Sequence, residues 1–346
     1  MKYKPYTFEN STATFFSWAP VLSGNPQFVG AIGARRFGKT YGCKKRIIKD
    51  YLYKDKKFMW LRDNDKSVEN LLQANGGGFW RDIKKEFEGR EFGARGNILT
   101  IDGHDAGVVQ NFMTFYNGKG VAFDDSYRNL ILDEAIPEKG QIKRGYRARS
   151  FLNMIYTVCD TRKDVRIWLT ANALNRGDEL LRLFGIKIQG FGIYTNRFGK
   201  NARVAIHYCD TTPAFKELQR DSAVGGLIAG SQYSRDLIEG HFDSENGLIY
   251  DVKPSNCKLV AILHGEEGAV RCWLAPSDGI IYVENDVNPD KRPEMRFATD
   301  ITLCDLVVRA LPDNLLQAFK NALIRNGVRY QDDFIRNIFL DVVMKK

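Results

Sequence analysis

The chain has 346 residues, of which 51 are lysine or arginine and 42 are aspartate or glutamate, so its formal net charge is +9. This length predicts two domains, each with a core of its own, and the basic balance is compatible with a polyanionic partner. No apolar run approaches the roughly 20 residues that cross a bilayer, and the amino terminus MKYKPYTFEN lacks the apolar core of a signal peptide, so we expect a cytosolic protein without a membrane partner.

A phosphate-binding motif follows the first predicted strand. The stretch PQFVGAI is typical of a short buried strand, GARRFGKT fits the pattern GxxxxGK[ST] without a mismatch, and YGCKKRIIKDYLY is typical of a helix. We expect Gly33 and Gly38 to take positive φ and turn backbone N–H groups toward a triphosphate at the helix amino terminus. Lys39 would reach the β and γ phosphates, and the Thr40 hydroxyl would bind Mg²⁺. The predicted nucleotide-contacting residues here are Gly33, Ala34, Arg35, Arg36, Phe37, Gly38, Lys39, Thr40 and Tyr41.

The next segment predicts a strand over 58–61, a helix over 65–74 and a hairpin over 97–116 that turns at Asp102-Gly103. Arg62 closes the strand, where it would contact the nucleotide or a neighbouring subunit, or form a structural ion pair. Lys119, in the loop NGKG, would assist a neighbouring site or touch DNA, although a mobile loop explains it as simply.

Two acids end the next apolar strand, as expected of the second half of a nucleotide site. Leu130, Ile131 and Leu132 form an unbroken apolar run, and Asp133 and Glu134 follow it. Asp133 would hold the magnesium through water, and Glu134 would polarise the attacking water. These acids also fit an ordinary surface, but a P-loop upstream favours the functional reading.

A basic loop and a third buried strand come next. We expect a helix from a capping Ser150 to Val158, then a strand over 165–172 that ends in Thr170 and Asn172, which would sense the γ-phosphate or form a simple turn. Strands alternating with helices indicate a mostly parallel sheet. A hairpin over 190–210, with its tip at Arg197 to Asn201, completes this part.

The pattern changes near residue 211. A helix with its cap at Thr212 begins a small linker, and three strands with tight turns follow over 258–286. Helices over roughly 302–311, 313–326 and 331–344 complete the chain. We therefore expect an α/β P-loop NTPase domain of the ASCE type with a mostly parallel sheet over 1–210, a helical linker over 211–245 and a second α/β domain over 246–346. Scattered cysteines and unpaired histidines indicate reduced thiols and no zinc site.

Several classes of nucleotide protein remain to be separated. A GTPase is disfavoured because no NKxD element occurs and position 136 is Ile. The glutamate after Asp133 favours an enzyme that activates water, and so a motor. A P-loop kinase of small molecules, a nucleic-acid-stimulated ATPase of another role and a non-enzymatic nucleic-acid binder stay as alternatives.

The order of segments resembles the genome-packaging ATPases of small tailed phages of the phi29 type. The likeness runs from the phosphate loop nearly to the carboxyl terminus. It is carried by FVGAIGARRFGKTYG, FMWLRD, LILDE, LNMIYTVCDTRKDVRIWLTANA, GAVRCWLAPSDGIIYVEND and DDFIRNIF. The resemblance implies a motor that imports double-stranded DNA into a procapsid. It would be a ring of five subunits that hydrolyses ATP at the portal vertex in the host cytoplasm; a role for a structural RNA stays open.

The resemblance also assigns residues. Lys39 and Thr40 hold phosphate and metal, Asp133 holds the metal, and Glu134 orients water. An arginine of the neighbouring subunit completes each site. Only Arg162 stands inside the corresponding loop CDTRKDVR, since Asp160 and Asp164 occupy places where relatives tend to carry arginine. Arg162 is the first candidate and Arg149 the second, and an ordinary surface charge is the alternative for each.

DNA would be held through its phosphates by the stretch Lys139–Arg149 or the hairpin tip Arg197–Lys200, unless these are solvated loops. The second domain would have a ribonuclease H-like fold without nuclease activity. The reason is that the first strand of such a nuclease needs a carboxylate, and LVAIL, residues 259–263, is wholly apolar.

Overall fold

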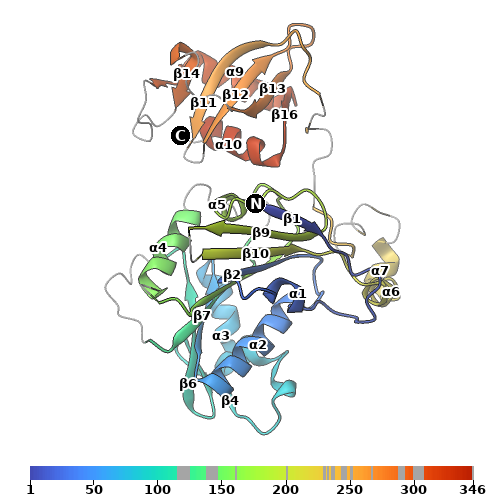
Figure 1. Cartoon of the computed structure of the whole chain (residues 1–346), viewed down its shortest axis with the longest axis vertical. Helices are drawn as coiled ribbons and strands as arrows, with labels where there is room; N and C mark the ends of the chain where they lie inside the picture. Colours follow the sequence, from blue (N-terminus) through green and yellow to red (C-terminus); the bar gives the residue numbers. More distant parts are fainter. Residues whose placement is uncertain are drawn as a thin grey trace. The chain divides into compact units, whose positions relative to one another are not determined.

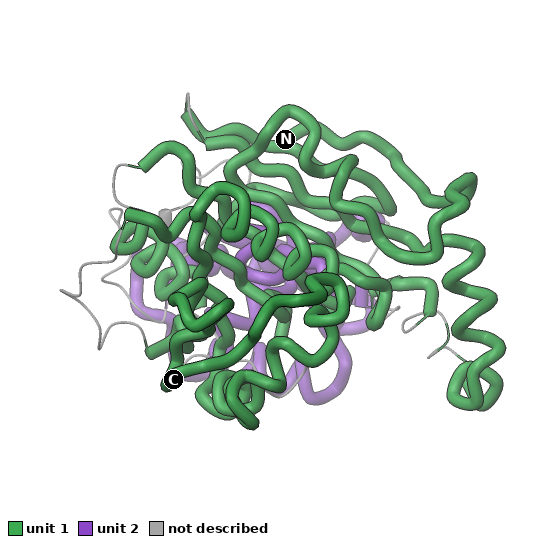
Figure 2. The backbone as a smooth tube through the Cα atoms, turned by 90° about the horizontal axis from the view of Figure 1, so that it is seen from below, with its two compact units in different colours: residues 1–174, 183–243 green, residues 175–182, 244–346 purple. Residues whose placement is uncertain are grey.

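The computed structural model describes residues 1–114, 125–137, 147–159, 162–199, 202–228, 231, 234, 238–242, 248–249, 252–265, 268–286, 293–298 and 308–344. The chain divides into two compact units (Figure 2). Unit 1 holds residues 1–174 and 183–243, and unit 2 holds residues 175–182 and 244–346. Among the described residues, no helix combines the length and the apolar character that crossing a bilayer requires.

Unit 1 is built on one large sheet (Figure 1). Its described strands lie in the order β1-β9-β10-β2-β8-β7-β3-β6-β5-β4. The six central strands, from β10 to β6, are parallel to their neighbours, and antiparallel pairs extend both edges. The strands are β1 (Lys2–Pro5), β2 (Phe28–Gly33), β3 (Lys57–Arg62), β4 (Phe92–Arg95), β5 (Ile98–Ile101), β6 (His104–Asn111), β7 (Tyr127–Asp133), β8 (Arg166–Asn172), β9 (Gly192–Phe198) and β10 (Ala202–Tyr208).

Helices cover this sheet because its central strands are apolar on both faces. One buried cluster joins Val29, Trp60, Ile131 and Trp168 of the sheet to the apolar sides of α1, α2 and α3. A different helix, α4, packs Phe151 against Phe112, which follows β6. The helices of this unit are α1 (Ala19–Leu22), α2 (Lys39–Lys54), α3 (Asp65–Trp80), α4 (Arg147–Cys159), α6 (Pro213–Arg220) and α7 (Ala223–Ile228), with a 3₁₀ turn at Lys84–Glu86. The expected mostly parallel α/β sheet is therefore confirmed.

Unit 2 has a six-stranded sheet in the order β15-β14-β11-β12-β13-β16. The three strands β11, β12 and β13 form an antiparallel meander, and β14 and β15 extend it in parallel beyond β11. The five strands β15, β14, β11, β12 and β13 lie in the order expected of a ribonuclease H-like sheet. The sixth strand, β16, is added beside β13. Its elements are β11 (Lys258–Gly265), β12 (Gly268–Leu274), β13 (Ile281–Asn285), β14 (Arg296–Ala298), β15 (Arg309–Ala310), β16 (Val328–Tyr330), α9 (Asp313–Ile324) and α10 (Asp333–Met344), with a 3₁₀ turn at Pro293–Met295.

A segment from the middle of the chain belongs to unit 2. Residues 175–182, which include most of α5 (Glu179–Leu183), lie against α10. Asn337 of α10 donates to the Gly177 carbonyl, and Arg182 is 3.3 Å from the Asp341 carboxylate. The segment that follows the third nucleotide-site strand is thus packed with the carboxyl-terminal unit.

Several expected elements differ from those observed. Ser150 does not cap α4, because the helix begins at Arg147 and Ser150 lies within it. The helix expected over 65–74 continues to Trp80 after a break at residues 73–76, where Gly76 with φ of 77° allows the chain to resume the helix. Arg309–Ala310 is a short strand beside β14 and not helix, because sheet pairing outweighs its weak helical pattern. Residues 301–307 lie outside the described part.

Candidate nucleotide-binding site

The loop between β2 and α2 has the backbone of a phosphate cradle. Gly38 has φ of 91° and caps α2, whose first-turn N–H groups point back toward the loop. The second left-handed residue is Arg36, with φ of 59°, and not Gly33 as expected. Gly33 is required for a different reason: a Cβ there would lie 2.6 Å from the carbonyl oxygen and Sγ of Cys209. The loop therefore depends on glycine at two positions, once for conformation and once for close packing.

Lys39 lies inside this loop. Its side chain is buried, and Nζ donates to the Gly33 carbonyl at 3.1 Å and to the Ala34 carbonyl. Burial lowers the pKa of Lys39 to about 8, against the raising effect of Cys209 and Asp133. The loop carbonyls thus hold the ammonium group inside the loop, where Lys39 lines the pocket.

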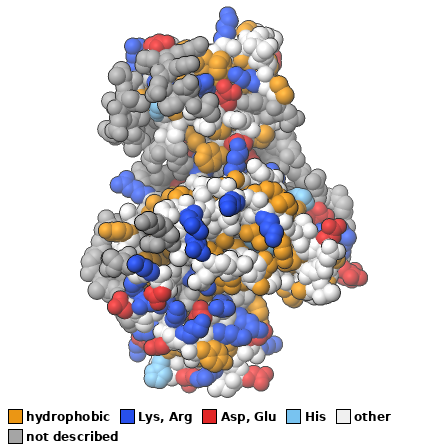
Figure 3. Space-filling view, viewed as in Figure 1, with side chains coloured by type: hydrophobic (Ala, Val, Ile, Leu, Met, Phe, Trp, Pro, Cys, Tyr) orange, Lys and Arg blue, Asp and Glu red, His pale blue; other side chains and the backbone are white. Residues whose placement is uncertain are grey.

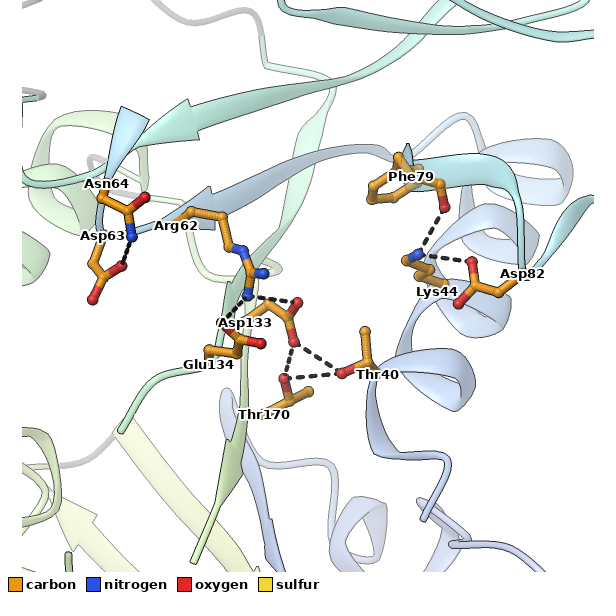
Figure 4. A network of polar contacts seen from close by, with 10 residues as sticks. All are labelled: Thr40, Lys44, Arg62, Asp63, Asn64, Phe79, Asp82, Asp133, Glu134 and Thr170. Carbon is orange, nitrogen blue, oxygen red and sulfur yellow. Dashed lines mark hydrogen bonds and ion pairs between the residues drawn. The ribbon is translucent and has the colours of Figure 1, made fainter. Parts of the chain in front are cut away.

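The acid at the end of β7 meets two hydroxyls from neighbouring elements (Figure 4). The Thr40 hydroxyl donates to Asp133 Oδ1 at 2.9 Å, and the Thr170 hydroxyl donates to the same oxygen. They meet because β7 and β8 are adjacent parallel strands and α2 begins beside their carboxyl ends. Asp133 is buried, so its carboxylate is fixed by these bonds. Hydroxyl and carboxylate oxygens are the ligands that Mg²⁺ prefers, and Thr40 and Asp133 fit that ion.

Arg62 joins the two acids. Its Nη1 lies 3.1 Å from Asp133 Oδ2 and 3.0 Å from Glu134 Oε2 (Figure 4). Glu134 has φ of 57°, a left-handed conformation that costs a non-glycine residue about 1 kcal/mol and is found preferentially at functional sites. Its side chain is 62% exposed, whereas that of Asp133 is 8% exposed. Arg62 was expected either to contact the nucleotide or a neighbouring subunit, or to form an ion pair within the chain. The ion pair is present, and its partners are the two acids of the site.

Lys39, Thr40, Asp133, Glu134 and Thr170 line one pocket of about 380 Å³, whereas Arg62 is not part of its lining. Of the predicted nucleotide-contacting residues, Gly33 and Ala34 lie outside its lining and serve the loop through their carbonyls. Phe37 contributes backbone only, because its ring is fully buried against Phe8 and Phe215. The predicted residues that do line the pocket are Arg35, Arg36, Phe37, Gly38, Lys39, Thr40, Tyr41, Asp133, Glu134 and Asn172.

Asp82 lines the pocket without having been predicted. Asp82 follows α3, and its Oδ1 forms an ion pair with Nζ of Lys44 of α2 at 2.9 Å. No local pattern marks it, because its place depends on how α3 packs beside α2. Thr170 was expected either to sense the γ-phosphate or to form a simple turn, and its hydrogen bond to Asp133 was not foreseen.

The two candidate trans arginines lie apart from this pocket's lining. Arg162 donates to the carbonyls of Cys159 and Tyr127, both at 3.1 Å, and its side chain is 13% exposed. Tyr127 begins β7, at the end of the strand opposite Asp133. Arg149 is exposed in the first turn of α4. Lys119, Lys200 and residues 138–146 of the basic loop lie outside the described residues, and Arg197 is exposed on β9.

A P-loop between β2 and α2, two acids at the end of the parallel strand β7, and polar residues at the end of β8, which lies between β2 and β7, define the class of P-loop nucleoside triphosphatase folds. The family model for the Podovirus DNA encapsidation protein (Gp16) matches residues 11–346. The chain therefore belongs to the Podovirus DNA encapsidation protein family.

Similar proteins cover nearly the whole chain. The DNA packaging protein of Bacillus phage B103 is 23% identical over 319 residues, which are 91% of this chain and 95% of that protein. The DNA packaging protein of Bacillus phage phi29 is 22% identical over 334 residues, 96% of this chain and 97% of that protein. The fold is similar to that in the bacteriophage Phi-29 viral genome packaging motor assembly, with a TM-score of 0.70, 19% identity, and coverage of 94% and 98% of the two chains.

Proposed function

We propose that this chain is the ATP-hydrolysing subunit of a motor that moves double-stranded viral DNA into a preformed procapsid. The observation that carries the proposal is the convergence of Lys39, Thr40 and Asp133 at one pocket, in a chain of a DNA encapsidation family. The motor would act in the host cytoplasm at the portal vertex, as a ring of five copies.

The chemistry assigned to the pocket is the hydrolysis of ATP. Lys39 and the α2 amino terminus bind the β and γ phosphates, and Thr40 and Asp133 hold Mg²⁺, which neutralises charge on the phosphates when bound. Glu134 orients the attacking water, and Asn172 lies at the end of β8 where a γ-phosphate would be sensed. Arg62 pairs with Glu134, so this ion pair would have to open for Glu134 to turn toward water.

ATP turnover with and without duplex DNA tests the proposal. Lys39→Ala and Glu134→Gln should each lower turnover by about a hundredfold or more, as expected for the loss of a phosphate ligand or a general base. Lys49→Ala, on the same helix, and Glu69→Gln, whose side chain is also 62% exposed, are matched controls that should keep parental rates. Parental turnover in both site variants, with folding intact, would contradict the site and with it the motor.

The same assay separates the rival functions. A small-molecule kinase would produce ADP only with its substrate present and would ignore DNA. A nucleic-acid binder with a degenerate site would bind duplex without ATP turnover. The family match favours the motor over both.

We also propose that an arginine of the neighbouring subunit completes each nucleotide site. Arg149 is exposed, whereas Arg162 must exchange its bonds to Cys159 and Tyr127 before it can reach another subunit. Mixing inactive Lys39→Ala subunits with inactive arginine variants distinguishes the two cases. If the arginine acts across the interface, the mixed ring regains turnover, because the intact P-loop and the intact arginine then meet. Turnover that stays absent on mixing would assign the arginine to its own subunit's site.

We also propose that unit 2 binds partners and does not cut DNA. Its first strand carries no acid over Leu259–Leu263, and the side chain of Asp286, which follows β13, is fully buried between Arg271 at 2.8 Å and Arg296 at 2.9 Å. A carboxylate held by two guanidinium groups is poorly placed to receive metal. Plasmid incubated with the protein and Mn²⁺ should stay intact, and cleavage lost on substitution of acids in unit 2 would refute this role.

A further inference from the structure

A second cavity lies at the opposite end of the strands that carry the nucleotide pocket. It has a volume of about 260 Å³ and opens where β2, β7 and β8 begin, beside the carboxyl half of α2. Arg166 at the start of β8 lines this cavity, and Asn172 at its end lines the nucleotide pocket. The two residues are six steps apart along the strand, about 20 Å at the usual rise, so the two sites are distinct.

Positive charge dominates this cavity. Its six basic side chains are those of Arg46, Lys54, Lys56, Arg128, Lys163 and Arg166, against the carboxylates of Asp50 and Asp164. We call it the basic cavity. Figure 3 shows that Lys and Arg side chains also gather over part of the visible face of unit 1. The basic cavity differs from the rest of this surface because its Lys and Arg side chains surround a cavity.

The two acids do not balance these charges. Asp50 is paired with both Arg46 and Lys54 at 3.4 Å, and Asp164 is paired with Arg128 at 2.8 Å. Within the described part of the chain, Lys56 and Lys163 have no carboxylate within ion-pair distance.

Arg166 likewise has an amide as its polar partner, Asn25 Oδ1, and lies over the Trp168 ring. Burial, followed by the nearby charge of Arg46, lowers the pKa of Arg166. The cavity therefore holds positive charge that its own acids leave unmatched.

Among the described residues that line the basic cavity, the buried side-chain atoms without hydrogen-bond partners are both donors. Asn129 is 2% exposed; its Oδ1 accepts from Trp168 Nε1 at 3.0 Å, but its Nδ2 has no acceptor among the described residues. Arg128 Nη1 is also buried without an acceptor there. A buried donor left unpaired is costly, so a ligand that brings acceptor oxygens would be bound preferentially.

We propose that the basic cavity binds backbone phosphates of double-stranded DNA. Phosphate oxygens supply both the negative charge and the acceptors that the cavity lacks. None of the described residues that line it is aromatic, so it offers no surface for stacking unpaired bases and suits a duplex backbone. Arg46 and Lys54 are 44% and 55% exposed at the rim, which leaves room for a strand to continue beyond the cavity. This assignment rests on the proposed role in DNA packaging.

The test is duplex binding by the full-length protein, followed by fluorescence anisotropy over about 50 to 200 mM salt. The Lys56→Gln, Lys163→Gln double variant removes two cations that have no ion pair to disturb. Lys49→Gln with Lys85→Gln is the matched control, since it removes the same charge from exposed positions of unit 1 outside the cavity. We expect about tenfold weaker binding for the cavity variant at low salt, and a log–log salt slope smaller by about one to two. The control should stay within about twofold of the parent.

Three results would overturn the proposal. The first is equal DNA affinity in the cavity variant and the control. The second is thermal stabilisation by inorganic phosphate that is lost in the cavity variant while DNA affinity is kept, which would make the cavity a site for a free anion. The third is a loss of oligomer with DNA affinity unchanged, which would make it a contact with another copy.

Basal ATP turnover separates this proposal from the proposed function. The cavity variant should hydrolyse ATP at the parental rate without DNA, because Lys56 and Lys163 line the basic cavity and not the nucleotide pocket. A parent that binds no duplex would refute the packaging function itself. A parent that binds DNA and turns over ATP, with a cavity variant that matches the control, would refute the cavity alone.

Discussion

His207 should make unit 1 sensitive to acid. It lies near the carboxyl end of β10 with its side chain fully buried, and Tyr6, Phe8 and Phe16 surround the ring at centroid distances of 5.1 to 5.6 Å. Neither ring nitrogen has a hydrogen-bond partner among the described residues. Burial in this aromatic environment lowers the pKa of His207 from 6.5 to about 4.

The direction of the pH effect on stability depends on whether the folded or the unfolded chain binds the proton more readily. The unfolded chain protonates His207 near pH 6.5 and the folded chain only near pH 4, so protonation favours unfolding as the pH falls between these values. The full shift corresponds to about 3 kcal/mol, and about 2 kcal/mol of it is lost between pH 7 and pH 5. His207→Leu replaces the imidazole by an apolar group of similar size, and should remove this part of the pH dependence.

Urea unfolding at pH 7 and pH 5, followed by tryptophan fluorescence, measures the effect. Trp18, Trp60, Trp80 and Trp168 lie in unit 1 and only Trp273 in unit 2, so the signal reports mainly the unit that contains His207. The other titrating groups are common to both proteins and cancel in the comparison. If parent and His207→Leu lose the same free energy of unfolding between the two pH values, the reasoning is wrong.

Three further predictions concern the nucleotide pocket. Burial lowers the pKa of Lys39 to about 8, and a bound phosphate needs the charged form of this lysine. ATP affinity should therefore fall up to about tenfold per pH unit above pH 8. Calorimetric titration that shows constant ATP affinity up to about pH 10 would contradict this. Arg62→Gln should raise DNA-independent turnover severalfold, since it frees Glu134 from its ion pair, and a large fall in kcat would instead place Arg62 on the nucleotide. Gly33→Ala should destabilise unit 1 by about 1 to 3 kcal/mol, because the new methyl group meets Cys209; an unchanged urea midpoint would show that the loop can yield.

The parts of the site that the sequence predicted are those fixed locally. The phosphate loop is a continuous motif whose glycine, lysine and threonine act within eight residues, so Lys39 and Thr40 could be placed without knowing the rest of the fold. Asp133 and Glu134 could be placed because an apolar strand that ends in acids has few interpretations beside such a loop. The roles of these residues remain predictions that the proposed assays test.

The parts that could not be predicted depend on the order of strands in the sheet. Arg62 meets Asp133 because β3 lies beside β7, although 71 residues separate them in sequence. Asp82 reaches the pocket through helix packing, and the short strands β14, β15 and β16 exist only because longer neighbours pair with them. A pattern within one segment carries no information about which distant segment will lie beside it.

The packing of residues 175–182 against α10 limits how the protein can be divided. Asn172 lines the nucleotide pocket and Asn175 already belongs to unit 2, so their Cα atoms are at most about 11 Å apart in any arrangement of the two units. The chain crosses between units three times, and cleavage near residue 243 cuts only one crossing. Cleaved protein should therefore retain its carboxyl-terminal fragment through Gly177 and Arg182, and a gene truncated at that point would leave these residues without the helix that covers them.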